Sequence, residues 1–461
     1  MDELKRQKEL VVTSLPEERI ATSRLPGFYD LPMAERVEKV ATLAGLGRAE
    51  AELLLAESAS LPLETANQMI ENAVGVISLP LGVGLNFRVN GVDHLVPMAV
   101  EEPSVVAAVS LAAKIARAGG GFSGTCDPSL MIAQIQVTQY GNAEVAREAL
   151  LAHREQILAL ANSFHPAMIR RGGGATDIEV RVLPAPEGPK GEPILVLHVI
   201  LDTQDAMGAN LINTVAEGVA PLVEQITGGQ VYLRILSNLA DRRLARATCR
   251  IPVEAMADFG MTGEQVAQGI VQASRFAEVD PYRACTHNKG VMNGVDAVAI
   301  ATGNDWRAIE AGAHAYAARN GRYEPLSTWR IEHADESGAQ KFLVGRIELP
   351  LAVGTVGGPI RIHPTVRLAH KLIQVSSAPE LAQIMAAVGL AQNMAALRAL
   401  GSVGIQRGHM ALHARCVAVT AGARGELVAE IAEQLIALGA AHVKLEKAKE
   451  LLAQATAAGS C

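Results

Sequence analysis

Residues 280–307 read DPYRACTHNKGVMNGVDAVAIATGNDWR and place two polar clusters on either side of the apolar run Val295–Ala301. Lys289 and Asp305 stand sixteen positions apart across this run, and an intervening strand or helix can return both to one face. Glycines 290, 294 and 303 are typical of loops in which backbone approaches a ligand closely. We therefore expect a site built from two polar loops. Two ordinary loops around a buried strand remain the alternative.

Length and composition set the scale of the molecule. A chain of 461 residues is too long for one ordinary core, so two or three domains are expected. Apolar residues make up 49% of the chain and aromatic residues only 3%, so the core must be built from small side chains that each bury little area. We expect oligomerisation to supply further burial. The net charge of −7 disfavours a nucleic-acid or anionic-membrane surface.

The cysteines and the N-terminal residues indicate the compartment. The five cysteines are scattered and form no CxxC pair, so neither a disulfide framework nor a zinc site is expected. The first ten residues, MDELKRQKEL, are charged and lack the apolar centre of a signal peptide. No run of about 18 apolar residues is present. We expect a soluble cytoplasmic protein without a membrane span.

The N-terminal part alternates between helical and strand patterns. Residues 1–24 form an extension, and helices are expected at 34–46, 49–58 and 62–75, the last ending at Gly75. The alternation around Asn90-Gly91 predicts a hairpin. The hairpin leads to Glu102 at a strand-to-helix junction. A carboxylate there can be a helix cap, or, if burial raises its pKa, a proton donor.

Residues 128–240 have a different pattern. Their strands and helices follow the order βαββαβ, which predicts a small ferredoxin-like domain. No G-x-G-x-x-G fingerprint follows a strand, so a Rossmann domain is not expected. The turn Asp205–Asn210, DAMGAN, opens a helix whose backbone N–H groups could hold a phosphate. Gly172–Gly174, preceded by Arg170 and Arg171, is a second candidate, although such turns usually have no ligand.

The chain then returns to its first domain. The predicted fold class is α+β: a discontinuous large mixed α/β domain (25–127 and 241–403), the inserted small non-Rossmann domain, and a mobile C-terminal helical flap (404–461). His409 and His413 have i, i+4 spacing, but no supporting Glu or Cys completes a metal motif, so no metal is expected. His409 suits a proton donor on a closing lid.

Six motifs together resemble one family. MIENAVG, VPMAVEEPS, DAMGANLINT, DPYRACTHNKGVMNG, GNDWR and RGHMALHAR are similar, in order, to motifs of the soluble bacterial class (class II) of 3-hydroxy-3-methylglutaryl-coenzyme A (HMG-CoA) reductase. The resemblance extends from about residue 24 to the tail. It implies NAD(P)H-dependent four-electron reduction of (S)-HMG-CoA to (R)-mevalonate and CoA through mevaldyl-CoA and mevaldehyde, in the mevalonate pathway.

The resemblance also implies catalytic roles. Lys289 matches the lysine that stabilises negative charge on the carbonyl oxygen, and Glu102 matches the glutamate that supplies a proton to it. Asp305 matches the aspartate placed between these two groups. His409 matches the histidine that protonates the CoA thiolate.

Binding roles follow from the same resemblance. Arg283 could pair with the HMG carboxylate, and the matching hydrogen-bonding residues are Ser104, Thr286 and Asn293. The matching nucleotide-binding residues are Asp205, Met207, Gly208 and Asn210. His165 stands where some members carry an acidic residue that favours NADH, so the 2′-phosphate of NADPH should be tolerated. The cofactor is therefore expected to be NADPH or NADH.

The resemblance further implies partners and alternatives. The expected assembly is a homodimer with a shared active site, possibly a hexamer of three dimers, that binds HMG-CoA, mevalonate and CoA. The same site would serve mevalonate oxidation in a catabolic pathway. A different acyl-CoA enzyme is another alternative. A non-catalytic CoA- or nucleotide-binding protein should lack Lys289, Glu102 or Asp305, and all three are present.

Overall fold

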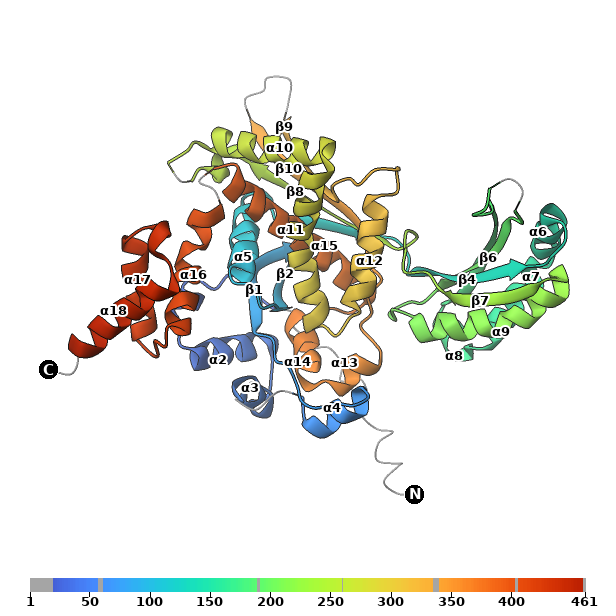
Figure 1. Cartoon of the computed structure of the whole chain (residues 1–461), viewed down its shortest axis with the longest axis horizontal. Helices are drawn as coiled ribbons and strands as arrows, with labels where there is room; N and C mark the ends of the chain where they lie inside the picture. Colours follow the sequence, from blue (N-terminus) through green and yellow to red (C-terminus); the bar gives the residue numbers. More distant parts are fainter. Residues whose placement is uncertain are drawn as a thin grey trace.

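The computed structural model describes residues 20–56, 61–188, 191–258, 260–334, 340–402 and 405–458; residues 359, 405–412, 440, 457 and 458 are described by their backbone alone. The described chain contains a six-stranded sheet with the order β2-β1-β3-β8-β10-β9 and a four-stranded sheet with the order β5-β6-β4-β7. Figure 1 shows the four-stranded sheet and its helices to one side of the larger unit, and helices α16–α18 on the opposite side.

Three short helices follow the 3-10 turn η2 (Phe28–Asp30): α2 (Met33–Ala44), α3 (Arg48–Leu55) and α4 (Leu63–Met69). All three were predicted, but the third ends at Met69, before the predicted stop at Gly75. The apolar side chains of Ile70, Val74 and Ile77 are exposed, so a longer helix would have no buried face to stabilise it.

The predicted hairpin is present. Strands β1 (Leu81–Val89) and β2 (Val92–Ala99) pair antiparallel, and Asn90 and Gly91 between them both have positive φ, at 51° and 82°. Two positive φ angles are typical of the tight turn that matches strand twist. Helix α5 (Val105–Ala116) and the 3-10 turn η3 (Arg117–Gly119) follow.

The rest of the large sheet comes from distant parts of the chain. Its remaining strands are β3 (Phe122–Cys126), β8 (Leu244–Pro252), β9 (Ser327–His333) and β10 (Lys341–Pro350). The β1–β3 pair is parallel, and the other neighbours pair antiparallel. The core packed against this sheet takes its residues mainly from the sheet and from helices α5, α10 (Gly263–Val279), α11 (Pro281–Ala301) and α15 (Ala378–Leu400), with the 3-10 turn η4 (Val253–Met256) leading into α10.

Residues 281–301 form one continuous helix, so the expected first polar loop is wrong. Gly290 and Gly294 lie within this helix, where Gly294 serves helix packing, whereas Gly303 lies in the turn after it with a φ of 67°. A Cβ on Gly294 would lie 3.0 Å from Cβ of Gln392 in α15, and one on Gly389 of α15 would lie 3.0 Å from Cγ2 of Val295. Because these glycines have no side chain, α11 and α15 approach closely at this contact. The polar residues of α11 lie on the face that does not pack against α15.

The inserted segment forms the ferredoxin-like unit. Its strands are β4 (Leu130–Thr138), β5 (Gly174–Leu183), β6 (Ile194–Asp202) and β7 (Gln230–Leu236). Its helices are α6 (Ala143–Ala152), α7 (Arg154–Ser163), α8 (Pro166–Ile169) and α9 (Ala209–Thr227). A separate core joins the sheet to α6, α7 and α9. The βαββαβ order that was predicted from hydrophobic patterning is thus present.

The remaining helices complete the large unit and the C-terminal part. They are α12 (Trp306–Ala317), α13 (Gly358–Ile362), α14 (Pro364–Ile373), α16 (Ile405–Thr420), α17 (Leu427–Ala437), η5 (Ala440–His442) and α18 (Leu445–Ala458). Helices α16–α18 bury a small core of their own, which includes Ala418, Ile431 and Leu435. Within the described residues, no helix is both long and apolar enough to cross a membrane.

Candidate active site

Lys289 and Glu102 form the first part of the site. The Nζ atom of Lys289, on α11, lies 2.8 Å from Oε2 of Glu102, two positions before the N-cap residue of α5. The pair is open to solvent, since the Lys289 side chain is 61% exposed and the Glu102 side chain 40%. The burial that a proton-donating carboxyl requires is therefore not provided by this chain alone.

The polar face of α11 carries the expected substrate residues. Thr286, Lys289, Asn293 and Asp296 are spaced by three, four and three positions, which places them on one face of a helix. This periodicity is visible in the sequence and could have predicted the helix. Thr286 is exposed and its hydroxyl donates to the carbonyl of Tyr282 at 3.3 Å, as hydroxyls in helices often do.

Two further substrate candidates flank this face. Arg283 is half-buried in the first turn of α11, and its partial burial lowers the pKa of its guanidinium. Ser104 is the N-cap residue of α5 with φ of 76°, and its Oγ is buried without a hydrogen-bond partner among the described residues. Because Ser104 lies two positions after Glu102, it belongs to the same junction.

Asp305 lies at the other end of α11. It is the N-cap residue of α12, where its carboxylate accepts from the backbone N–H of Ala308 at 3.1 Å and lies 3.7 Å from the guanidinium of Arg307. The twelve residue steps from Lys289 to Ala301 in the helix rise about 18 Å at 1.5 Å per step. The expectation that the sixteen-residue spacing returns Lys289 and Asp305 to one point is therefore wrong within one chain.

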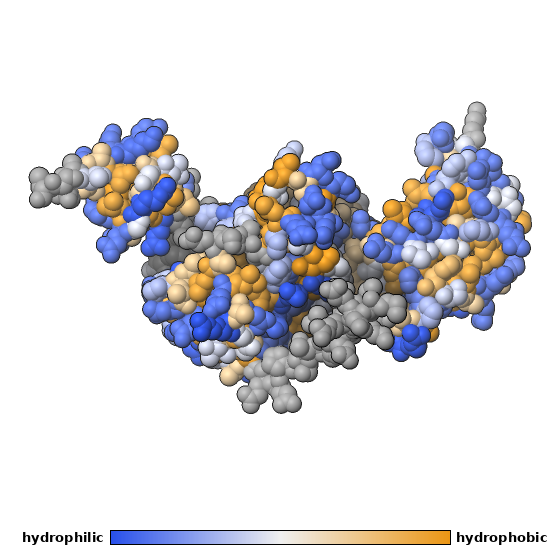
Figure 2. All heavy atoms as spheres, turned by 90° about the horizontal axis from the view of Figure 1, so that it is seen from below, coloured by the Kyte–Doolittle hydropathy of each residue, from blue (hydrophilic) through white to orange (hydrophobic). Residues whose placement is uncertain are grey.

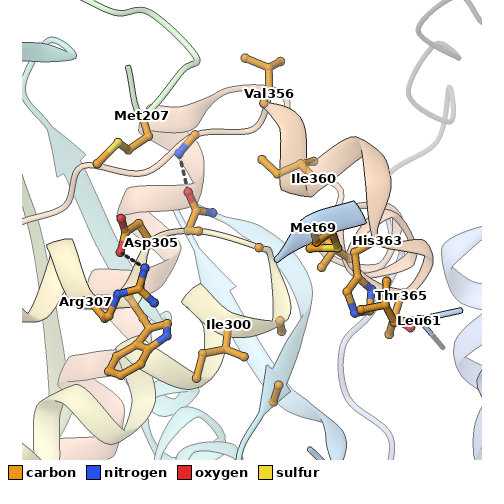
Figure 3. A pocket seen from close by; sticks show the side chains of 18 of the residues that line it. Leu61, Met69, Met207, Ile300, Asp305, Arg307, Val356, Ile360, His363 and Thr365 are labelled. Atoms are coloured by element: carbon orange, nitrogen blue, oxygen red, sulfur yellow. Dashed lines mark hydrogen bonds and ion pairs between the residues drawn. The ribbon is translucent and has the colours of Figure 1, made fainter. Parts of the chain in front are cut away.

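Asp305 faces a pocket of about 780 Å³ between the inserted unit and the large unit (Figure 3). Met207, Gly208 and Asn210 line it, as does the first turn of α9. Such a volume suits part of a cofactor or substrate. A Cβ on Gly354 would lie 2.7 Å from the backbone N of Met207, so this glycine lets the two walls approach.

Asp205 lies next to this pocket, but its polar groups bond to the backbone of the large unit. Its carboxylate accepts from the backbone N–H of Ala378 at 2.8 Å, and its carbonyl accepts from Thr355 at 2.9 Å. Buried Arg243 donates to Oγ1 of Thr203 and to the carbonyls of Ala206 and Val353. These bonds tie the turn after β6 to the large unit.

His165 lies elsewhere in the inserted unit. It is the N-cap residue of α8, and its Nε2 is buried without a partner among the described residues. Arg170 and Arg171 follow α8 and are exposed. The three residues thus lie at the two ends of one short helix.

The histidines predicted for the flap are only partly described. The side chain of His409 lies outside the described residues, and His413 on α16 is exposed. In the described part of the chain, no group of three or more His, Cys, Asp and Glu side chains could hold a metal ion.

Sequence reasoning missed a partly buried polar network beside the site. Burial, together with a hydrogen bond to Glu310, raises the pKa of Asp296 to about 9. Glu310 also lies 2.6 Å from Nε2 of His314, whose Nδ1 lies 2.6 Å from the hydroxyl of Tyr323. The signal was present, since Asp296 interrupts an apolar run. His287 is a buried core histidine whose pKa burial lowers to about 4.

Known proteins are similar to this chain in sequence and in fold. A family model described as hydroxymethylglutaryl-coenzyme A reductase matches residues 32–414. The 3-hydroxy-3-methylglutaryl-coenzyme A reductase of Archaeoglobus fulgidus is 49% identical, over 94% of this chain and 95% of its own length. A probable reductase of the same name from Borreliella burgdorferi is 36% identical over 75% of this chain and 76% of its own.

Solved structures agree. A Streptococcus pneumoniae 3-hydroxy-3-methylglutaryl-coenzyme A reductase matches with a TM-score of 0.77 and 42% identity, covering 93% of this chain and 99% of that one. A class II reductase from the same organism, bound to NADPH in open conformations, matches with a TM-score of 0.75 and 43% identity over 92% of this chain and all of that one. The resemblance to class II reductases is confirmed. This chain belongs to the hydroxymethylglutaryl-coenzyme A reductase family.

Proposed function

We propose that the Lys289–Glu102 pair of one subunit performs the NAD(P)H-dependent reduction of HMG-CoA to mevalonate opposite the Asp305 pocket of a second subunit. The main support for this proposal is the ion pair between Nζ of Lys289 and Oε2 of Glu102, 2.8 Å apart on the polar face of α11, in a chain of the HMG-CoA reductase family. The Lys289 ammonium donates a hydrogen bond to the thioester oxygen as negative charge develops there. Glu102 supplies the proton that this oxygen takes up.

The release of CoA, the second reduction and the binding of HMG-CoA use the other candidate residues. As the carbon–sulfur bond of the hemithioacetal breaks, its hydroxyl returns a proton to Glu102 and becomes the aldehyde carbonyl. CoA leaves as a thiolate, which takes a proton from His409. Lys289 and Glu102 then act again on the aldehyde oxygen, which gives the alcohol of mevalonate. Arg283 holds the distal carboxylate, with hydrogen bonds from Ser104, Thr286 and Asn293 to the HMG group.

The pocket at Asp305 has the features that a nicotinamide nucleotide needs. Met207, Gly208 and Asn210 form a turn at the start of α9, where free backbone N–H groups and the helix dipole favour phosphate oxygens. A nicotinamide bound there would supply one hydride in each of the two reductions. Asp305, on the pocket wall, orients the groups around the reacting carbon.

We further propose a preference for NADPH. His165 carries a buried Nε2 without a partner among the described residues, and Arg170 and Arg171 follow the same short helix. An unpaired imidazole nitrogen and two guanidinium groups provide the donors that a 2′-phosphate accepts from.

A second copy of the chain would complete the site. Lys289 lies near the middle of α11 and Asp305 beyond its C-terminal end, and the Lys289–Glu102 pair is exposed. Exposed apolar side chains lie about two helical turns before Lys289, at the junction of α10 and α11, where Val279 is 73% and Tyr282 85% exposed. Figure 2 shows apolar side chains, in orange, reaching the surface of the central lobe. Burial of this region in a homodimer would desolvate Glu102 and bring it towards the partner's pocket.

The direct test mixes the purified protein with HMG-CoA and either NADPH or NADH, and follows the absorbance of the reduced nicotinamide. We expect two nicotinamides to be oxidised for each mevalonate formed, with the faster rate for NADPH. Absence of oxidation with both cofactors would refute the proposed reaction.

Complementation tests the shared site. The Lys289→Ala and Asp305→Ala variants should each be inactive alone. In a co-expressed mixture, half of the dimers are mixed and each has one intact site, so about a quarter of the wild-type activity should return. If no activity returns although mixed dimers are isolated by two affinity tags, both residues act in one chain.

A further inference from the structure

Two polar atoms at one end of the pocket have no role in the fold. Nδ1 of His363 and Oγ1 of Thr365 are buried and have no hydrogen-bond partner among the described residues, and both side chains line the pocket. They lie on either side of Pro364, at the start of α14. Figure 3 shows them at the end of the pocket away from Asp305 and Arg307.

Another histidine on the same helix shows the contrast. Nε2 of His370 lies 2.9 Å from the carbonyl oxygen of Thr302, so its buried polar atom is satisfied within the fold. Leaving buried polar atoms unpaired costs free energy, and native structures pair the great majority of them. Two unpaired atoms on one pocket wall therefore point to a group that binds there.

The chemistry of this wall selects a neutral group. Burial lowers the pKa of His363, so its imidazole is uncharged at neutral pH. A neutral imidazole nitrogen and a hydroxyl can present one donor and one acceptor. The surrounding lining is apolar, with Leu61, Ile360 and Val366, and the Arg307 guanidinium lies at the other end. Among the described residues that line this end, no cation is available to a phosphate or carboxylate, whereas a carboxamide offers the matching acceptor and donor.

We propose that His363 and Thr365 form a carboxamide-binding subsite that holds one reactant in the pocket. The inference rests on the proposed function, because both proposed reactants carry this group: the nicotinamide ring has a carboxamide, and the pantetheine arm of CoA has two amides. The subsite determines affinity for one of them. In either reactant, the amide C=O and N–H groups would pair with the side chains of His363 and Thr365.

Apolar variants separate this role from a structural one. His363→Leu and Thr365→Val remove the two polar atoms at similar size. In the ligand-free protein they should leave the melting temperature unchanged or raise it, because no hydrogen bond is lost and a desolvated polar atom is removed. His363→Asn and Thr365→Ser keep a polar atom near the same place. Arg367→Leu changes an exposed residue of the same helix and is the control.

The experiment titrates NADPH and CoA separately into the full-length protein and each variant, with binding followed by fluorescence or calorimetry. Loss of a ligand hydrogen bond in an apolar pocket should raise one dissociation constant about tenfold. A change for NADPH alone assigns the nicotinamide amide; a change for CoA alone assigns a pantetheine amide. The Asn and Ser variants should restore most of the affinity, and Arg367→Leu should bind both normally.

Unchanged dissociation constants for both ligands in His363→Leu and Thr365→Val would overturn the subsite. So would a lowered melting temperature with proportionally weaker binding of both ligands, which would mark the two atoms as structural. Because binding is titrated without turnover, the subsite can fail while HMG-CoA reduction is retained. Conversely, a chain that binds both ligands and does not oxidise NADPH would refute the proposed reaction alone.

Discussion

Oε2 of Glu102 accepts a hydrogen bond from Nζ of Lys289 at 2.8 Å, although 187 positions separate the two residues in the chain. Glu102 comes from the junction between a hairpin and α5, and Lys289 from the polar face of α11. The close packing of α11 on α15 orients that face towards Glu102. The pair thus joins the proposed proton source to the cation that we propose stabilises the oxyanion, the two functions that carbonyl reduction requires.

Glu102→Gln removes the proton source and keeps an oxygen that can accept from Lys289. We expect kcat to fall about 100-fold or more, a typical loss for a general acid. The KM for HMG-CoA should change little, because the carboxamide occupies the same space. Steady-state kinetics with HMG-CoA and NADPH measure both constants. A kcat within twofold of wild type would show that the proton comes from another group.

Arg283→Lys tests carboxylate binding. A lysine keeps the charge but loses the planar pair of donors, so we expect the KM for HMG-CoA to rise about tenfold. The KM for NADPH should stay unchanged. Arg275→Lys alters an exposed arginine of α10 and is the matched control. Equal effects of the two substitutions would remove Arg283 from the substrate site.

Asp296→Asn tests the buried carboxyl beside the site. The folded pKa of Asp296 is raised to about 9 by burial and by Glu310, whereas an unfolded aspartate titrates near its ordinary value of about 4. The folded state therefore holds a proton that the unfolded state releases, and stability falls as pH rises from about 4 to about 9. The asparagine variant lacks this proton.

We expect a smaller decrease of melting temperature between pH 5 and pH 9 in Asp296→Asn than in wild type. Asp241→Asn, at an exposed carboxylate, should retain the wild-type slope. Thermal unfolding across this pH range measures the difference. Parallel curves for wild type and Asp296→Asn would mean that Asp296 is ionised in the folded protein.

The elements that are organised by local pattern were predictable from the sequence. The hairpin at Asn90-Gly91 and the βαββαβ order of the inserted unit depend on turn chemistry and alternation, and both are present. Residues 281–301 were misinterpreted because Gly290 and Gly294 were taken as loop residues, whereas Gly294 packs closely against α15. That contact depends on a helix almost a hundred residues away, although the three-four-three spacing of the polar residues in this segment does indicate a helix.

The candidate site was predictable as a set of residues but not as an arrangement. Family motifs identified Glu102, Lys289 and Asp305, and the structure brings the first two together while placing Asp305 at the far end of α11. That separation follows from the rigid rise of a helix and required knowing that the segment is helical. His363 and Thr365 had no sequence signal, because an unpaired buried atom is a property of packing.

His165→Asp tests the cofactor preference. A carboxylate beside the 2′-phosphate of NADPH would repel it and could instead accept from the ribose hydroxyls of NADH. We expect the ratio of kcat/KM for NADPH to that for NADH to fall about tenfold or more. Measuring kcat/KM for both cofactors in wild type and variant gives the ratio. An unchanged ratio would place the adenosine ribose away from His165.

Lys289→Ala gives the most direct test of the central claim. Lys289 is exposed, and among the described residues its side chain bonds to Glu102 alone, so its removal should leave the fold intact. Loss of the cation at the carbonyl oxygen should lower kcat about 100- to 1,000-fold. The measurement is the rate of NADPH oxidation with saturating HMG-CoA, alongside the melting temperature. An unchanged melting temperature with that loss is the predicted result, and near-wild-type turnover would contradict the account.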